Sequence, residues 1–179
     1  IIFTSTSKIT FPGAGVAVEA ASPNNVALLK GRMKYQTIGP DKLNQLRHAR
    51  MFRTVSDIER HMKRHAAILR PKFETVEKEL QKQLGDTGVA RWTTPKGGYF
   101  ISLYVLEGCA KRVEQLCANA GMILTPAGAT YPYGIDPKDS NIRIAPSYPS
   151  VEEIEKASEV LALAVRYAAL EKLLSDKEN

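Results

Sequence analysis

The sequence predicts a mixed fold that starts as an α/β arrangement and ends as a small α+β domain. Short apolar runs separated by Gly, Pro and Ser near both ends of the chain are typical of strands and turns. Between them, apolar residues recur every three or four positions over residues 56–84, which indicates one long helix. We therefore expect the end of a larger domain at residues 1–52, a linking helix at 53–85 and a compact α+β domain at 86–179.

The first part is expected to contain a pair of strands followed by a pair of helices. Their expected ranges are strands 1–3 and 14–20 and helices 22–35 and 41–52. Ser22 and Pro23 support the first helix start, because Ser caps free N–H groups and Pro suits the first helical turn. Gly39 and Pro40 then break the helical pattern. Because an apolar run opens the chain without a Met, we expect the chain to be a piece of a longer protein.

The long helix is expected to begin at a capping box formed by residues 56–59 and to kink at Pro71. The elements expected after it are strands 89–92, 98–105, 123–125 and 141–146, a helix at 109–120, and a helix that starts at residue 150. A second capping box at residues 150–153 marks the start of that last helix. Its apolar period is expected to fade into a charged tail after residue 168.

Charge and cysteine content restrict the classes of protein that this sequence suits. The net charge of +6 comes from residues 30–72, which hold 12 Lys and Arg against three acids. Such a block occurs in contacts with nucleic acid or acidic partners and on solvated helix faces, and we favour the solvated face. No apolar run approaches the ~20 residues of a membrane span. Cys109 and Cys117 fit neither a disulfide framework nor a zinc site, so a reducing, cytoplasmic location is expected.

Two further patterns are too incomplete to carry a function. His61 and His65 are spaced as metal ligands on a helix are, but no third ligand is near and no Glu stands between them. No metal site is therefore expected. Gly13 and Gly15 form a Gly-x-Gly pair without the third glycine of a dinucleotide-binding motif.

Lys8 is the strongest candidate for chemistry. It lies in a hydroxyl-rich loop directly after an apolar strand. A lysine that attacks a carbonyl must lose its proton, and a low-dielectric site favours that loss. Ser5 and Ser7 add hydroxyls that can bind phosphate, while Gly13 and Gly15 let the backbone approach a neighbour. From these residues alone, an ordinary exposed loop lysine remains the alternative.

Five segments of the chain then add a resemblance to a known family. They are STSKITFPGAGV at 5–16, IGPDKLNQLRHAR at 38–50, PKGGYF at 95–100, GMILTPAG at 121–128 and NIRIA at 141–145. In this order they resemble the C-terminal part of class I/II, fold-type I, pyridoxal-phosphate-dependent aminotransferases. The first two are similar to the bacterial branch known as type Ic aspartate aminotransferases. The resemblance covers essentially the whole chain.

The resemblance implies a role for each part of the chain. Residues 1–52 would be the C-terminal remnant of the large cofactor-binding domain, 53–85 the interdomain helix and 86–179 the small domain. Lys8 would form the Schiff base with pyridoxal 5'-phosphate and carry the proton during amino transfer. Ser5 and Ser7 would help to bind the cofactor.

Arg143 would bind the α-carboxylate of the substrate, for which a planar guanidinium suits a two-point grip. In a strand, Ile142 and Ile144 point to one side and Arg143 to the other, so Arg143 can face a cavity while its neighbours pack. Without the resemblance, a surface arginine on an edge strand would be the simpler interpretation.

The chain also departs from the family pattern. Many relatives carry an arginine seven or eight residues after the lysine, where this chain has Gly15 and Val16. The acid beside the pyridine nitrogen, the aromatic residue on the ring and the partner of its phenolic oxygen all precede the lysine in this family. We therefore expect the 179-residue chain alone to be inactive.

The expected function is transfer of the amino group of aspartate, or of another acidic amino acid, to a 2-oxo acid by a homodimer. The basic residues that could grip a second carboxylate are Lys34, Lys42, Arg47 and Arg50. The alternative is a non-catalytic, aminotransferase-like effector domain of a DNA-binding regulator, or a nucleic-acid contact made by residues 30–72. That segment offers only Tyr35 and Phe52 among its basic residues and no recognition motif, so nucleic acid is not the expected partner.

Overall fold

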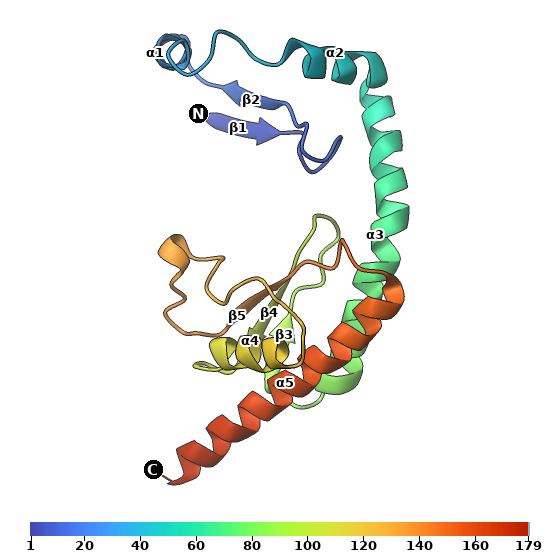
Figure 1. Cartoon of the computed structure of the whole chain (residues 1–179), viewed down its shortest axis with the longest axis vertical. Coiled ribbons are helices and arrows are strands. Elements are labelled where there is room, and N and C mark those ends of the chain that lie inside the picture. The colour runs from blue at the N-terminus through green and yellow to red at the C-terminus, as the bar shows by residue number, and fades with distance from the viewer. Residues whose placement is uncertain (179) are drawn as a thin grey trace. The chain divides into compact units, whose positions relative to one another are not determined.

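The computed structural model describes residues 1–178, which fall into two compact units (Figure 1). The first unit covers Ile1–Ala67 and the second begins at Ile68. The boundary lies inside the long helix α3, Val55–Leu84, which therefore contributes to both units.

The first unit is a hairpin of two strands followed by helices. Strands β1 (Ile2–Ser5) and β2 (Ala17–Ala20) pair in antiparallel fashion, with Ser5 opposite Ala17. Helices α1 (Pro23–Met33) and α2 (Lys42–Met51) follow, and then the first part of α3. The strands and helices expected in this part are thus present, although β2 begins three residues later than predicted.

The helix starts of the first unit agree only partly with the sequence. The carboxylate of Asp41 caps α2 by accepting a hydrogen bond from the Asn44 N–H at 2.9 Å, whereas Ser22 stands at the start of α1 without a side-chain capping bond. The capping box predicted at residues 56–59 is wrong. Thr54 and Asp57 form it instead: Thr54 N–H donates to Asp57 Oδ2 at 3.0 Å and Asp57 N–H donates to Thr54 Oγ1 at 3.3 Å. Both pairs have the required spacing, and the earlier one lets α3 begin at Val55.

Pro71 lies inside α3, whose helical conformation runs through it from Val55 to Leu84. A proline cannot donate the usual backbone hydrogen bond, so the hydrogen-bond ladder of α3 lacks one bond at this position. The Thr75 hydroxyl donates to the carbonyl oxygen of Pro71 at 2.8 Å.

The second unit packs three antiparallel strands against helices (Figure 1). The sheet order is β3 (Ala90–Trp92), β4 (Ile101–Val105) and β5 (Asn141–Ile144). The helices are the second part of α3, α4 (Ala110–Asn119), the short 3₁₀ helix η1 (Pro132–Gly134) and α5 (Val151–Glu178). A mixed α/β arrangement with small sheets, as the sequence predicts, is therefore confirmed in outline.

The strand predicted at residues 123–125 is absent. Residues 122–126 form an irregular segment, and the side chain of Ile123 is 93% exposed. The N–H of Met122 donates to the carbonyl oxygen of Cys117 at 2.9 Å and so closes the end of α4 rather than a sheet ladder. A short run of this kind does not define a strand by itself, because a strand also needs to pair with a neighbour. Residues 123–125 stay unpaired, although β3 and β5 at the edges of the sheet are each paired on one side only.

The last helix confirms its predicted start and is longer than its apolar pattern suggests. Ser150 N–H donates to Glu153 Oε2 at 2.7 Å and Glu153 N–H donates to Ser150 Oγ at 3.2 Å, which is the predicted capping box. The charged tail continues as helix to Glu178, helped by an ion pair between Lys172 and Asp176 one turn apart.

The hydrophobic core lies in the second unit, between the sheet and helices α3, α4 and α5. Its most deeply buried large side chains are Leu80, Leu84, Ile101, Leu103, Ile142, Val76, Val113 and Val165. Both cysteines belong to this core as free thiols. Burial raises the pKa of Cys109, and it raises the pKa of Cys117 to about 11. Within residues 1–178, no helix combines the length and apolar character needed to cross a membrane.

Replacing Leu80 with Ala is expected to lower the free energy of unfolding by about 2–5 kcal/mol, because it opens a cavity at a side chain that is 0% exposed. The measurement is urea denaturation of the 179-residue chain, followed by the fluorescence of its single tryptophan, Trp92, which packs against the core. Leu163 of α5 is 65% exposed, so Leu163→Ala is the matched control and should change stability by less than about 0.5 kcal/mol. Equal effects of the two substitutions would contradict the placement of the core.

Candidate functional site

The predicted cofactor-binding residues Ser5, Ser7 and Lys8 lie together where the β1–β2 hairpin turns. The N–H groups of Ile9 and Thr10 both donate to the carbonyl oxygen of Thr6 at 2.9 Å, so residues 6–10 form a tight turn around Lys8. The Ser5 and Ser7 hydroxyl oxygens are 2.6 Å apart, and the N–H of Ser7 donates to Ser5 Oγ at 3.0 Å. Ser5, Ser7 and Lys8 are all exposed in this chain. The loop thus offers two hydroxyls beside one lysine.

Glycine is required at two positions of this loop. Gly13 has φ +72°, a conformation that other residues rarely adopt. Gly15 has an ordinary φ, but a Cβ atom there would collide with Ser7 Oγ and lie 2.9 Å from Ser7 Cα. The expectation of a close backbone approach is confirmed for Gly15, whose neighbour is Ser7, but not for Gly13, where a Cβ atom would meet nothing within 4 Å.

Helix α2 contributes two residues that contact this loop and that were not among the predicted site residues. His48 Nε2 lies 2.8 Å from Thr10 Oγ1, and Asn44 Nδ2 donates to the carbonyl oxygen of Ala14 at 2.8 Å. The ring of Phe11 packs edge-on against His48 with 5.0 Å between the ring centroids. Asn44 and His48 are four residues apart on one helix and so lie on the same face. This spacing is the feature of the sequence that indicates a shared contact surface.

Arg143 belongs to the second unit, where it lies on β5 opposite Ser102 of β4. Ile142 and Ile144 are 1% and 8% exposed, whereas Arg143 between them is half-buried on the other face of the sheet. This alternation is the predicted one. The guanidinium carbon of Arg143 lies 4.6 Å from the ring centroid of Phe100, and its Nε is buried without a hydrogen-bond partner in the described structure. The guanidinium thus lies over an aromatic ring while its Nε makes no hydrogen bond within the described structure.

A polar network fixes the strand that carries Arg143. Asn141 Nδ2 donates to Ser102 Oγ at 2.8 Å, and the Thr130 hydroxyl donates to Asn141 Oδ1 at 2.6 Å. Just before the strand, the carboxylate of Asp136 accepts hydrogen bonds from three backbone N–H groups. The donors are Lys138 at 3.0 Å, Ser140 at 2.8 Å and Asn141 at 2.9 Å.

The pKa of Asp136 reflects this network. Burial by itself raises the pKa, but the three backbone donors and the charge of Lys138 outweigh it. The pKa of Asp136 consequently lies below its ordinary value of 3.8. The ionised carboxylate is therefore part of the folded loop.

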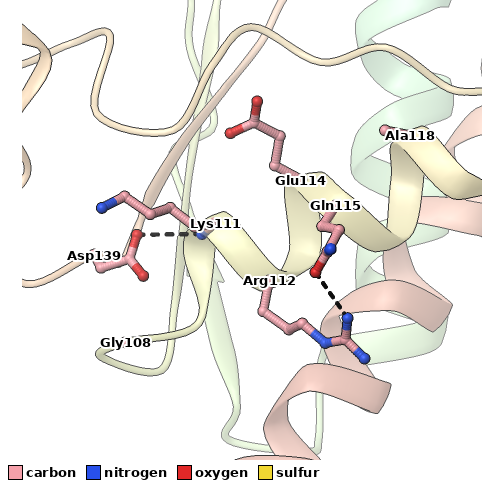
Figure 2. A pocket seen from close by; sticks show the side chains of 7 residues that line it. All are labelled: Gly108, Lys111, Arg112, Glu114, Gln115, Ala118 and Asp139. Atoms are coloured by element: carbon pink, nitrogen blue, oxygen red, sulfur yellow. Dashed lines mark hydrogen bonds between the residues drawn. The ribbon is translucent and has the colours of Figure 1, made fainter.

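A hollow beside α4 in the second unit is a separate feature (Figure 2). Its lining residues are Gly108, Lys111, Arg112, Glu114, Gln115, Ala118 and Asp139. Two of its charged side chains are engaged within the chain: Arg112 Nε and Nη2 each donate to the Glu171 carboxylate at 2.7 Å, and Glu114 Oε2 accepts a hydrogen bond from the N–H of Ala127. None of the predicted site residues lines this hollow.

The histidine pair of α3 lies in the first unit near the same loop. The His61 and His65 ring centroids are 4.3 Å apart, and His61 Nε2 donates to the carbonyl oxygen of Thr10 at 3.2 Å. Burial, followed by the neighbouring His61, lowers the pKa of His65. Over residues 1–178, no group of three or more His, Cys, Asp or Glu side chains is arranged to hold a metal ion.

Comparison with known proteins identifies the family to which this fold and these segments belong. A family model described as aspartate amino-transferase matches residues 1–177. The chain belongs to the aspartate aminotransferase family.

Individual relatives define which part of such a protein the chain represents. The aspartate aminotransferase of Corynebacterium glutamicum is 48% identical over 94% of this chain and 39% of that protein. The crystal structure of an aspartate transaminase from Corynebacterium glutamicum matches with a TM-score of 0.90 at 48% identity, over 95% of this chain and 40% of that one. The chain thus spans about 40% of the length of these relatives and corresponds to their C-terminal part.

Two more distant matches are also informative. An α-aminoadipate aminotransferase of Thermus thermophilus, solved with N-(5'-phosphopyridoxyl)-L-leucine, matches with a TM-score of 0.77 over 94% of this chain and 42% of that one. At 20% identity it shows the fold alone. An uncharacterized HTH-type transcriptional regulator of Bacillus subtilis is 27% identical over 92% of this chain and 33% of that protein.

Replacing Asp136 with Asn is expected to lower the melting temperature at neutral pH by about 2–4 °C, the shift that a loss of about 1 kcal/mol causes in a chain of this size. Because the folded pKa lies below the unfolded one, the stabilisation is fully present above the ordinary pKa of 3.8 and is lost as the pH falls through the folded pKa. The difference between the two proteins should therefore shrink below about pH 4.

The measurement for this prediction is thermal denaturation followed by circular dichroism between pH 3 and pH 7. Asp86 is an exposed acid of the same unit, so Asp86→Asn makes the same charge change outside the network. That control should leave the melting curve unchanged. A Tm difference for Asp136→Asn that stays constant down to pH 3 would show that the carboxylate charge plays no part.

Proposed function

We propose that this chain is the C-terminal portion of an aminotransferase that uses pyridoxal 5'-phosphate, with Lys8 as the residue that binds the cofactor covalently. The observation that carries the proposal is the family match over residues 1–177, together with the turn that places Lys8 beside two hydroxyls. The Ser5 and Ser7 pair suits a phosphate group, since hydroxyls donate to phosphate oxygens, and the absence of a side chain at Gly15 leaves room for Ser7. When bound, the cofactor supplies an electron sink for the substrate's α-carbon.

The role proposed for Lys8 follows from the chemistry of its amine. Lys8 would hold the cofactor covalently through its Nζ until the amino group of the substrate displaces it. The freed, neutral Nζ would then accept the proton from the α-carbon of the substrate and deliver it to the cofactor side, so that the amino nitrogen leaves the substrate. The turn at residues 6–10 supports this role, because it holds the backbone of Lys8 while leaving the side chain exposed.

The role proposed for Arg143 is to bind the α-carboxylate of the amino acid and of the oxo acid. Its planar guanidinium can make two parallel hydrogen bonds to a carboxylate. The ring of Phe100 at 4.6 Å and the unused Nε support a side chain that is fixed in orientation and has donor capacity left for a ligand.

Aspartate or another acidic amino acid, with a 2-oxo acid as acceptor, is the proposed substrate class. The support is the printed name of the relative that is 48% identical to this chain. A cytoplasmic homodimer is the proposed form of the complete enzyme.

The second candidate is a non-catalytic effector domain of a DNA-binding regulator. The similarity to an HTH-type transcriptional regulator at 27% identity is the observation in its favour, and the 48% identity to an aspartate aminotransferase weighs against it. A DNA-binding segment encoded in the same gene would favour the regulator.

Borohydride reduction of the complete gene product with its cofactor is expected to fix the cofactor on the peptide that contains Lys8. Lys8→Ala should abolish both this label and the visible absorbance of the bound cofactor, since alanine offers no amine. Peptide mapping by mass spectrometry and absorbance spectroscopy are the measurements. Lys30 is an exposed lysine of α1, and Lys30→Ala should leave both signals intact. A stable label on a different lysine would end the assignment of Lys8.

Arg143→Lys is expected to reduce kcat/KM for all α-amino acid substrates alike, by about 2–4 kcal/mol in transition-state binding, because the charge stays but the two-point grip is lost. Steady-state kinetics of the complete gene product with dicarboxylic and with uncharged amino acids is the measurement. Arg91 also lies over an aromatic ring, with its guanidinium carbon 4.0 Å from the Tyr104 centroid, so Arg91→Lys is the matched control and should leave kcat/KM unchanged. A loss confined to dicarboxylic substrates would instead assign Arg143 to the second carboxylate.

A further inference from the structure

His48 of α2 makes more contacts to the Lys8 loop than its place in the sequence suggests. Its Nε2 lies 2.8 Å from Thr10 Oγ1 and 3.3 Å from Thr6 Oγ1. These two threonines are the first and last residues of the turn that contains Lys8. A single ring nitrogen therefore holds both ends of that turn.

The position of the ring protons follows from the other nitrogen. His48 Nδ1 lies 2.9 Å from the backbone carbonyl oxygen of Asn44, which can only accept a hydrogen bond. Nδ1 therefore carries a proton, and Nε2 is the acceptor in the neutral ring and a donor in the charged one. Helix α2 thus fixes the tautomer that the loop requires.

The hydroxyl of Thr10 can serve either state of the ring. It lies 2.8 Å from His48 Nε2 and 3.1 Å from the carbonyl oxygen of Thr6. With a neutral ring the hydroxyl donates to Nε2, and with a charged ring it accepts from Nε2 and donates to the Thr6 carbonyl. The proton of the Thr10 hydroxyl thus has an acceptor in both states, so the contact between Thr10 and His48 is compatible with either charge of the ring.

Other contacts of the same helix and of α3 fix the rest of the loop. Asn44 Nδ2 donates to the carbonyl oxygen of Ala14 near the end of the loop, and His61 Nε2 donates to the carbonyl oxygen of Thr10. The Phe11 ring, 5.0 Å from the His48 ring, covers the contact. Thr10 is 4% exposed, so the hydrogen bonds at its hydroxyl are shielded from water.

From these contacts we propose that His48 is a positioning residue for Lys8. It holds the two ends of the turn at residues 6–10 and so fixes the backbone position from which the Lys8 side chain extends. The consequence for amino transfer rests on the proposed function. The consequence for the order of the loop does not, since it follows from the hydrogen bonds alone.

Two substitutions of His48 distinguish the roles of its two ring nitrogens. The Gln side chain places a polar atom near the position of Nε2, whereas the Asn side chain places one near Nδ1 only. His48→Asn should therefore release the turn, and His48→Gln should restore most of the wild-type behaviour. His65→Asn is the matched control, because the His65 ring lies against His61 rather than against the turn.

The first measurement is amide hydrogen exchange of the cofactor-free complete gene product at Ile9, Thr10 and Val16. In His48→Asn we expect exchange at these amides to become at least about 10-fold faster. The reason is that local opening of the turn no longer requires the His48 hydrogen bonds to break, so the open state is reached more often. His48→Gln and His65→Asn should exchange as the wild type does. Unchanged exchange in His48→Asn would overturn the proposal.

The second measurement is steady-state kinetics of the complete enzyme. A misplaced Lys8 should lower kcat by about 10- to 100-fold, with KM for the amino acid unchanged, because the substrate is bound by other residues. A rise in KM with kcat unchanged would contradict a role in placing Lys8. If borohydride labels another lysine in the wild type, the proposed function is wrong, while the exchange result still decides whether His48 orders the loop.

Thr10→Val provides a test that does not depend on the folding of the histidine variants. Valine keeps the size of threonine and removes the hydroxyl that binds Nε2. It should speed the exchange of the same amides. The effect of the double variant with His48→Asn should fall short of the sum of the two single effects, since both substitutions remove the hydrogen bond between Thr10 Oγ1 and His48 Nε2. Additive effects of the two substitutions would show that the residues act independently and would overturn the proposal.

Discussion

The order of the first unit depends on the hydrogen bonds of the buried Thr10 hydroxyl. Thr10 is the only buried residue among residues 1–67, and neither α1 nor α2 has a buried side chain. Few side chains of this unit are buried within the described chain, which spans about 40% of the length of its relatives. A buried hydroxyl without a partner costs about 1–3 kcal/mol, so the contacts of Thr10 with Thr6 and His48 constrain how the loop and α2 lie.

The second unit is held by a different principle. Residues of β4 and β5 alternate between an apolar face in the core and a polar face with Ser102, Asn141 and Arg143. The buried Ile142 anchors the register, because a shift by one residue would exchange the two faces. The orientation of Arg143 is thus a consequence of the packing of its neighbours.

Regular elements with a strong pattern were predictable from the sequence. Three predicted features of this kind are present in the structure: the long apolar period of α3, the alternation around Arg143 and the capping box at Ser150. Each of these patterns fits only one local backbone structure. The prediction of a strand at residues 123–125 was wrong, because strand formation depends on a partner edge that a local pattern does not reveal. The start of α3 was misplaced, because the pairs beginning at Thr54 and at Ser56 both satisfy the spacing of a capping box.

The candidate site was predictable where chemistry restricts the residue type. Lys8 and the serines around it stand in one short segment, and Gly15 was expected to allow a close approach, although Ser7 was not foreseen as the neighbour. His48 was missed because its partners are 38 and 42 residues away, and contacts at that separation depend on how α2 packs rather than on local sequence.

The state of the two cysteines has a practical consequence for labelling experiments. Cys109 and Cys117 are both buried, and the pKa of Cys117 is raised to about 11, so little thiolate is present near neutral pH. Since maleimides and other thiol reagents react with the thiolate, these native side chains should stay unmodified while the fold is intact. A cysteine introduced at an exposed position would then be the preferred attachment point on this chain for a fluorophore or spin label.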